Sequence, residues 1–144
     1  MPARSSFDYA VVRVVPRVER GEFLNVGVIL ISREQGYLGA RVGLDPARLR
    51  ALAPDLDAAT LNELAAHVEA IARIAAGDDQ ADPIARLTQA ERFHWLSAPR
   101  STMVQISEVH GGFSDNPAAE LDRLFAALVA RPTKARRRGS ASAR

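Results

Sequence analysis

The sequence predicts an α+β domain: a small, mainly antiparallel sheet of about four strands, with helices packed on one face, in the order β-β-β-α-α-α-β-α. Three observations predict this class. Residues 7–42 hold three apolar segments of strand length. Residues 45–96 hold helix caps followed by apolar residues at helical spacing, and residues 101–130 hold one more alternating segment and a last amphipathic helix. A run of strands followed by a run of helices is typical of α+β proteins.

The first three strands are expected at Phe7–Val15, Asn25–Ile31 and Tyr37–Val42. The first segment is largely apolar on both of its alternating faces, which predicts a central strand or one covered on both sides. Pro16 ends it, because proline cannot donate to the ladder. Gly27 lies inside the second strand, where glycine indicates a bulge or a close backbone approach. The second and third strands should form a hairpin, with the first strand antiparallel to the second.

Three helices are expected next. Asp45 stands before a proline, a typical N-cap and N1 pair, and opens a short helix. Asp57 caps a longer helix that runs to about Ala75, because apolar residues recur there at spacings of three and four. Thr88, followed three residues later by a glutamate, forms a capping box that opens a helix through Leu96. The apolar stripe of the long helix consists of Leu61, Leu64, Val68, Ile71 and Ala75.

The rest of the body adds one strand and one helix. Residues 101–107 alternate between apolar and polar side chains, which predicts a half-exposed fourth strand. Residues 110–117 are expected to form a loop, and residues 117–130 an amphipathic helix. Residues 1–130 therefore form a single α+β domain, followed by an expected disordered basic tail at residues 131–144. The half-exposed strand could also pair edge to edge in a homodimer.

Charge is distributed unevenly along the chain. The 144 residues hold 19 basic and 17 acidic side chains, but six basic ones and no acidic one lie in residues 131–144. The body is therefore mildly acidic, and its net charge gives no support to nucleic-acid binding. The tail has two interpretations: a nonspecific hold on nucleic acid or an acidic partner, or a solubilising end without a specific role. Its candidate contacts are Lys134, Arg136, Arg137 and Arg138.

The composition excludes several classes of site. The chain has no cysteine, so disulfides, a thiol nucleophile and a cysteine-bound metal are excluded. The three histidines are isolated in the sequence, so no metal site and no cofactor are expected. The longest apolar run, Val26–Ile31, is too short to span a membrane, and no secretory signal precedes the first strand. A cytoplasmic protein is expected.

Five polar residues gather around the connection between the first two strands: Arg13, Arg17, Arg20, Glu22 and Asn25. One interpretation is a binding site for an anion, since the planar guanidinium of arginine binds phosphate and carboxylate bidentately. The other is an internal network, in which Arg13, on an apolar face, pairs with Glu22 or another acid. The alternating signs of charge favour the internal network.

A second cluster consists of His94, Trp95 and Arg100. Tryptophan and arginine are frequent anchors of interfaces, so these residues could bind a base or a peptide. In the alternative interpretation, Trp95 belongs to the core and Arg100 is a charge at a strand edge.

A third group lies between His110 and Asp115. A nucleophile there would require Ser101 or Ser114 with a histidine and an acid, but sequence spacing does not identify a triad, and no Gly-x-Ser-x-Gly elbow is present. The two glycines that follow His110 instead favour a turn. No catalytic residue is therefore assigned.

Several short motifs together resemble a known family. They are Tyr9…Arg13-x-x-Pro16, Arg20-Gly-Glu22, Asn25-Val-Gly-Val28, Glu91-Arg-Phe-His-Trp95 and Pro99-Arg-Ser-Thr102. Over about residues 7–130 the chain resembles the bacterial family known as domain of unknown function 3037. The resemblance implies a small cytoplasmic domain without assigned catalysis, and a HipA-like kinase that it would accompany as an accessory or antitoxin-like partner. It implies no catalytic residues.

Three functional hypotheses follow. The first is a non-catalytic interaction module that binds a protein partner through the first connection and the Trp95 and Arg100 surface. The second is an enzyme or ligand-binding subunit that acts on a phosphorylated or nucleotide-like molecule, with Glu22 or His94 for proton transfer. It requires Arg13, Arg17, Arg20 and Arg100 to converge on one pocket. The third is a nucleic-acid binder that acts through its tail.

Overall fold

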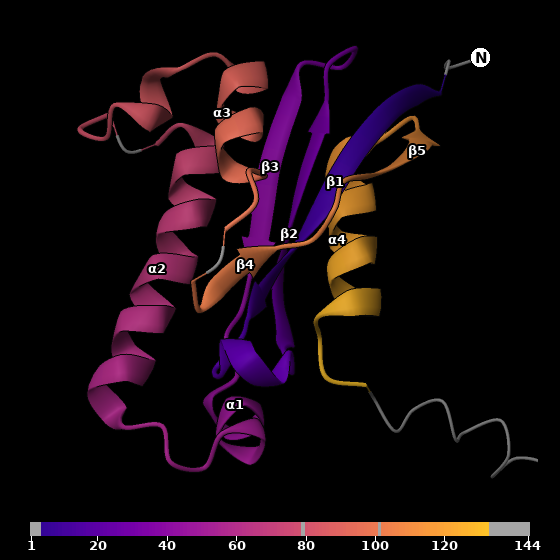
Figure 1. The fold of residues 1–144 in the computed structure, drawn as a ribbon. Helices are drawn as coiled ribbons and strands as arrows, with labels where there is room; N and C mark the ends of the chain where they lie inside the picture. The colour runs from indigo at the N-terminus through magenta and orange to yellow at the C-terminus, as the bar shows by residue number, and fades with distance from the viewer. Residues whose placement is uncertain (1–3, 79, 101, 133–144) are drawn as a thin grey trace, which may run out of the picture.

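The computed structural model describes residues 4–78, 80–100 and 102–132, and it has the predicted α+β class: an antiparallel five-stranded sheet with helices packed on it (Figure 1). The strands are β1 (Ser5–Val14), β2 (Leu24–Ser32), β3 (Tyr37–Val42), β4 (Val104–Ile106) and β5 (His110–Ser114). The helices are α1 (Pro46–Leu52), α2 (Ala58–Ala76), α3 (Gln89–Leu96) and α4 (Pro117–Leu128), with short 3-10 turns η1 (Val18–Arg20) and η2 (Ile84–Arg86).

The strand β1 is central, as its two apolar faces predict. The sheet order is β3-β2-β1-β4, and β5 also pairs with β1. The strand β4 pairs with residues 12–14 of β1, and β5 pairs with residues 5–9, so the two short strands share one edge. Side chains of β1 alternate between two cores: Val12 and Val14 lie on one face, and Phe7 and Tyr9 on the other.

The predicted irregularity at Gly27 is confirmed. The register of β1 against β2 shifts between Val12, which pairs with Gly27, and Arg13, which pairs with Asn25. A Cβ atom on Gly27 would lie 2.7 Å from the Val42 Cγ1 atom, so only glycine lets β2 and β3 approach this closely.

The prediction of a loop at residues 110–117 is wrong for its first half, which forms β5. Glycines weakened the strand signal. The structure needs one of them, because a Cβ on Gly112 would lie 2.7 Å from the Phe7 Cζ atom.

The strand predicted at residues 101–107 is shorter in the structure, where it forms β4 (Val104–Ile106). Beyond it, buried Ser107 joins the edge to β1: its Oγ accepts from Val11 N at 2.8 Å, and its N–H donates to Val11 O at 2.9 Å.

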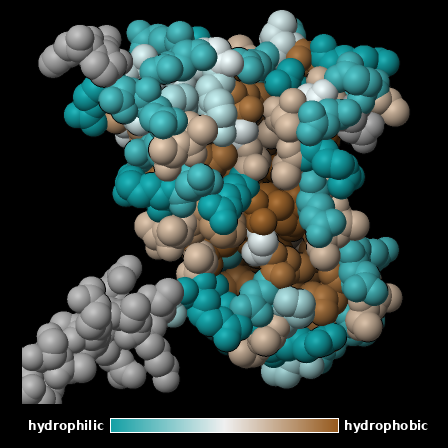
Figure 2. All heavy atoms as spheres, turned by 180° about the vertical axis from the view of Figure 1, so that it is seen from behind, coloured by the Kyte–Doolittle hydropathy of each residue, from teal (hydrophilic) through white to brown (hydrophobic). Residues whose placement is uncertain are grey.

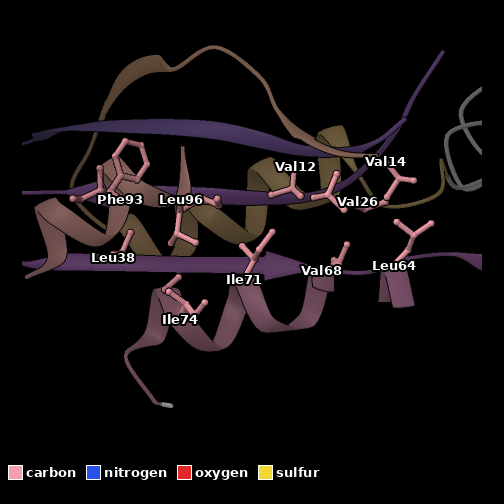
Figure 3. Packing of buried hydrophobic residues seen from close by; sticks show 14 of the residues in the cluster. Val12, Val14, Val26, Leu38, Leu64, Val68, Ile71, Ile74, Phe93 and Leu96 are labelled. Atoms are coloured by element: carbon pink, nitrogen blue, oxygen red, sulfur yellow. The ribbon is translucent and has the colours of Figure 1, made fainter. Parts of the chain in front are cut away.

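Helices cover both faces of the sheet rather than one (Figure 1). The larger core lies under α2 and α3 (Figure 3), and the smaller one lies under α4. The physical reason is the pattern of β1 and β2, which present apolar side chains to both sides. The larger core includes Val12, Val14, Val26, Leu38, Leu64, Val68, Ile71, Ile74, Phe93 and Leu96. The smaller one consists of Phe7, Val28, Leu30, Leu121, Leu124 and Val129.

The helix ends follow the predicted caps. Asp45 accepts from the backbone N–H groups of Ala47 and Arg48, and Asp57 accepts from that of Thr60. Thr88 and Glu91 form the reciprocal capping box at the start of α3. Among the described residues, no helix combines the length and the apolar character that crossing a membrane requires.

Candidate functional site

Two arginines of the connection between β1 and β2 are paired with carboxylates. Arg20 donates from Nε to Glu22 Oε1 over 2.8 Å, and Arg17 forms an ion pair with Asp55, which follows α1. The Arg20 guanidinium holds the pKa of the Glu22 carboxyl below its ordinary value. A hollow of about 260 Å³ lies between these groups, and Leu52 also lines it. The predicted anion-binding arginines of this connection therefore already hold carboxylates.

Arg13 differs from the other arginines near this connection. The Cζ atom of its guanidinium lies 4.2 Å from the centroid of the Phe23 ring, a cation–π contact, and the predicted pair with Glu22 is not formed. The opposite residue on β2 is Asn25, whose Nδ2 donates to Leu128 O at 3.1 Å. Arg13 Nε and Asn25 Oδ1 are both buried without a hydrogen-bond partner among the described residues. The two predicted residues thus lie together, on the face of the sheet that α4 covers.

Phe23, which is not among the predicted site residues, lies at the centre of this region. Its side chain is 45% exposed and borders a shallow hollow of about 370 Å³. A second hollow of about 240 Å³ shares Leu24 and Arg48 with the first and extends to Phe125 and Val129. We call the residues that line the first hollow, together with Arg13 against the Phe23 ring, the Phe23 surface: Arg13, Phe23, Leu24, Arg48, Ala51 and Leu52.

The second arginine of the Phe23 surface is Arg48 on α1. Its NH1 atom donates to the Val129 carbonyl over 2.9 Å, which ties α1 to the end of α4. Neither Arg13 nor Arg48 forms an ion pair with a carboxylate in the described part of the chain. The nearby carboxylate of Asp45 is bound by Arg131, which holds the pKa of Asp45 below its ordinary value. The Phe23 surface therefore combines apolar side chains with two positive charges that no carboxylate of residues 4–78, 80–100 and 102–132 compensates.

The second predicted cluster lies elsewhere. Trp95 is 43% exposed, so it is not a core residue. Arg100 donates to the carbonyls of Leu96 at 2.9 Å and Trp95 at 3.2 Å, and its Cζ atom lies 5.2 Å from the centroid of the Trp95 ring. Arg100 thus satisfies the last carbonyls of α3. His94 is exposed. On α2, partial desolvation and then the positive charge of Arg100 lower the pKa of His67.

The two predicted clusters are not brought together into one pocket. In Figure 1 the β1–β2 connection lies beside α1 at the lower end of the sheet, whereas α3 lies toward the upper end. Arg17, Arg20 and Glu22 share one hollow, and neither Arg13 nor Arg100 lines it. The predicted tail contacts, Lys134, Arg136, Arg137 and Arg138, lie outside the described residues.

The third predicted group, between His110 and Asp115, makes structural contacts. The His110 ring packs against Tyr9, with 5.4 Å between centroids, and Ser114 Oγ accepts from the Asn116 N–H at the start of α4. Ser101 lies outside the described residues. Within residues 4–78, 80–100 and 102–132, no group of three or more His, Asp or Glu side chains is arranged to hold a metal ion.

The sequence matches the family described as Protein of unknown function (DUF3037) over residues 9–129. This chain belongs to the DUF3037 family. In this DUF3037 protein the match begins within β1 and ends directly after α4, so it includes the Phe23 surface and the pair of Trp95 and Arg100. No curated protein and no solved structure matches the chain.

Proposed function

We propose that this DUF3037 protein is a non-catalytic interaction subunit, and that its Phe23 surface binds an acidic, partly apolar segment of a protein partner. One observation carries the proposal: an exposed phenylalanine that borders an apolar hollow lies under an arginine that pairs with no carboxylate of the described residues. Aromatic residues and arginines are enriched in the core of protein interfaces, where they supply most of the binding energy.

The apolar part of the surface supports a protein segment as the ligand. Phe23, Leu24, Ala51 and Leu52 line a hollow large enough for one or two apolar side chains. Burial of such side chains stabilises a complex by roughly 25 cal/mol per Å² of apolar area, minus the cost of association.

The positive charges of the Phe23 surface support an acidic partner segment. Arg48 lines the hollow and Arg13 lies against the Phe23 ring, and carboxylates on the partner would gain charge-assisted hydrogen bonds from both. The described chain ends at Pro132, after Arg131 at the second hollow, and the sequence from residue 133 onward holds five more basic and no acidic residues. An acidic partner is therefore attracted at long range as well as on contact.

The family resemblance suggests a HipA-like kinase as the partner. An accessory or antitoxin-like subunit needs no catalytic residues of its own, and it acts by covering or holding a surface of the kinase. The proposal therefore predicts a stoichiometric complex of the two proteins.

The test is affinity purification of the tagged full chain from its host, followed by identification of what binds. We expect a stoichiometric protein partner, whose binding falls at least tenfold on Phe23→Asp, because the substitution places a carboxylate in an apolar hollow. Trp95→Ala is the matched control, since it removes an equally exposed aromatic residue at the other cluster.

Other results would contradict the proposal. Loss of the partner with Trp95→Ala but not with Phe23→Asp would move the binding surface to α3. Recovery of a nucleotide or phosphorylated molecule in place of a protein would favour a ligand-binding subunit. Recovery of nucleic acid alone, abolished by truncation after Ala130, would favour a binder that acts through its tail.

A further inference from the structure

The strand β3 ends the sheet with an open backbone edge. The Gly43 N–H donates to Val26 O over 2.7 Å, so the backbone groups of Gly43 point toward β2. Successive residues of an antiparallel strand alternate in this direction. The N–H and C=O groups of Leu38, Ala40 and Val42 therefore point away from β2, to the side on which the described chain places no further strand.

The two edges of the sheet differ in how they are protected. The edge formed by β4 and β5 is divided at residues 107–109, and β4 has only three residues. In β3, six consecutive residues pair with β2 without a register shift, and none is a proline. Bulges, prolines, charges and short strands are the usual protections of a free edge against pairing. Only one of these is present on β3, the charge of Arg41.

The surroundings of β3 are apolar. Figure 2 shows the molecule from behind, with hydrophobic residues exposed along its middle between two hydrophilic flanks. The strand β4 lies in front in Figure 1 and β3 is the opposite edge of the sheet, so this view faces the β3 side. Ala40, Val42 and Leu44 are half-buried apolar residues along this side.

We propose that this edge pairs with the β3 strand of a second copy of the chain, which joins two sheets into one. The pairing is antiparallel, with the two-fold axis at Ala40. Side chains opposite each other must share a face of the sheet, so Leu38 lies opposite Val42 of the second copy, and Ala40 lies opposite its equivalent. This register uses every outward backbone group of Leu38, Ala40 and Val42. It is independent of the Phe23 surface.

The charges beside β3 match this arrangement. Arg41 pairs with Asp122 on α4 at 3.0 Å, so each copy presents a neutral pair and two copies meet without net repulsion. In the proposed register Arg41 lies opposite Gly39 of the second copy. A Cβ on Gly39 would lie 2.5 Å from the Tyr37 oxygen, so the Tyr37 ring extends over that glycine. The guanidinium of one copy thus meets the Tyr37 hydroxyl of the other.

The first test is the mass of the full chain in solution, by light scattering and sedimentation over a range of concentrations. We expect twice the 15.6 kDa of one chain. Ala40→Pro removes an N–H that points away from β2, so it should leave the monomer folded and raise the dissociation constant about ten- to hundredfold. Val109→Pro, in the divided edge, is the matched control and should leave the dimer intact.

The second measurement needs no substitution. Amide hydrogen exchange by NMR should show protection at Leu38, Ala40 and Val42 that rises with protein concentration, whereas Gly39 and Arg41 are protected at every concentration. A chain that stays monomeric at millimolar concentration, or a dimer in which the Ala40 amide exchanges freely, would overturn the proposal.

Discussion

Two groups of arginines lie on either side of Leu52, and one of them pairs with no carboxylate in the part of the chain that the structure describes. Arg17 and Arg20 line one hollow and are held by Asp55 and Glu22. Arg13 and Arg48 belong to the Phe23 surface, where one lies over an aromatic ring and the other donates to a backbone carbonyl. The density of arginines in a sequence therefore does not locate a binding site. Their partners in the fold decide which charges remain available to a ligand.

The comparison is tested most directly by removing one charge from each group. Arg48→Gln and Arg20→Gln change the net charge equally, but the first removes an uncompensated charge and the second an already paired one. We expect partner affinity to fall about tenfold or more with Arg48→Gln and about twofold or less with Arg20→Gln, measured by calorimetry. Equal losses in both variants would mean that net charge, and not the Phe23 surface, controls binding.

Substitution of Arg13 should change partner affinity more than it changes the stability of the fold. No hydrogen bond links its guanidinium to another described residue, and its buried Nε has no partner. Arg13→Met keeps the apolar stem and a contact with the Phe23 ring, so we expect the free energy of unfolding to change by less than about 1 kcal/mol.

Partner affinity, in contrast, should fall about fivefold with Arg13→Met, because a cation is lost from the interface. Denaturant unfolding and calorimetry on the same preparation check both results. A large loss of stability with unchanged affinity would instead make Arg13 a structural residue.

Local signals in the sequence were sufficient for most of the fold. The caps at Asp45, Asp57 and Thr88 each depend on residues within one helical turn, and the structure has all three helices that they open. The strand β5 was missed because its glycines lack strand propensity. Gly112 is required only by the ring of Phe7, which is distant in the sequence. A local pattern cannot reveal such a contact.

The candidate site is less predictable than the fold, because most of its contacts join residues that are distant in the sequence. Arg13 and Asn25 were identified, and the structure places them opposite each other. The partner of Arg17, Asp55, lies beyond α1, and Arg48 joins the region only because α1 packs beside the start of β2. The one local signal that could have found the Phe23 surface was an aromatic residue within a charged connection.

The smallest expected effect concerns the ion pair of Arg20 and Glu22, and it is a dependence of thermal stability on pH. Hydrogen bonding to Arg20 lowers the pKa of Glu22 from its ordinary value of 4.5. A carboxyl whose pKa is lower in the folded state stabilises the fold above its unfolded pKa, and this contribution is lost as the pH falls through the folded value.

The melting temperature of Glu22→Gln should therefore lie slightly below that of the wild type at pH 7, on the order of 1 °C, because the pair is exposed. The two melting temperatures should converge as the pH falls below 4.5. Thermal unfolding followed by circular dichroism between pH 7 and pH 2 checks this, and a difference that persists at the acid end would show that the side chain of Glu22 acts through packing and not through its charge.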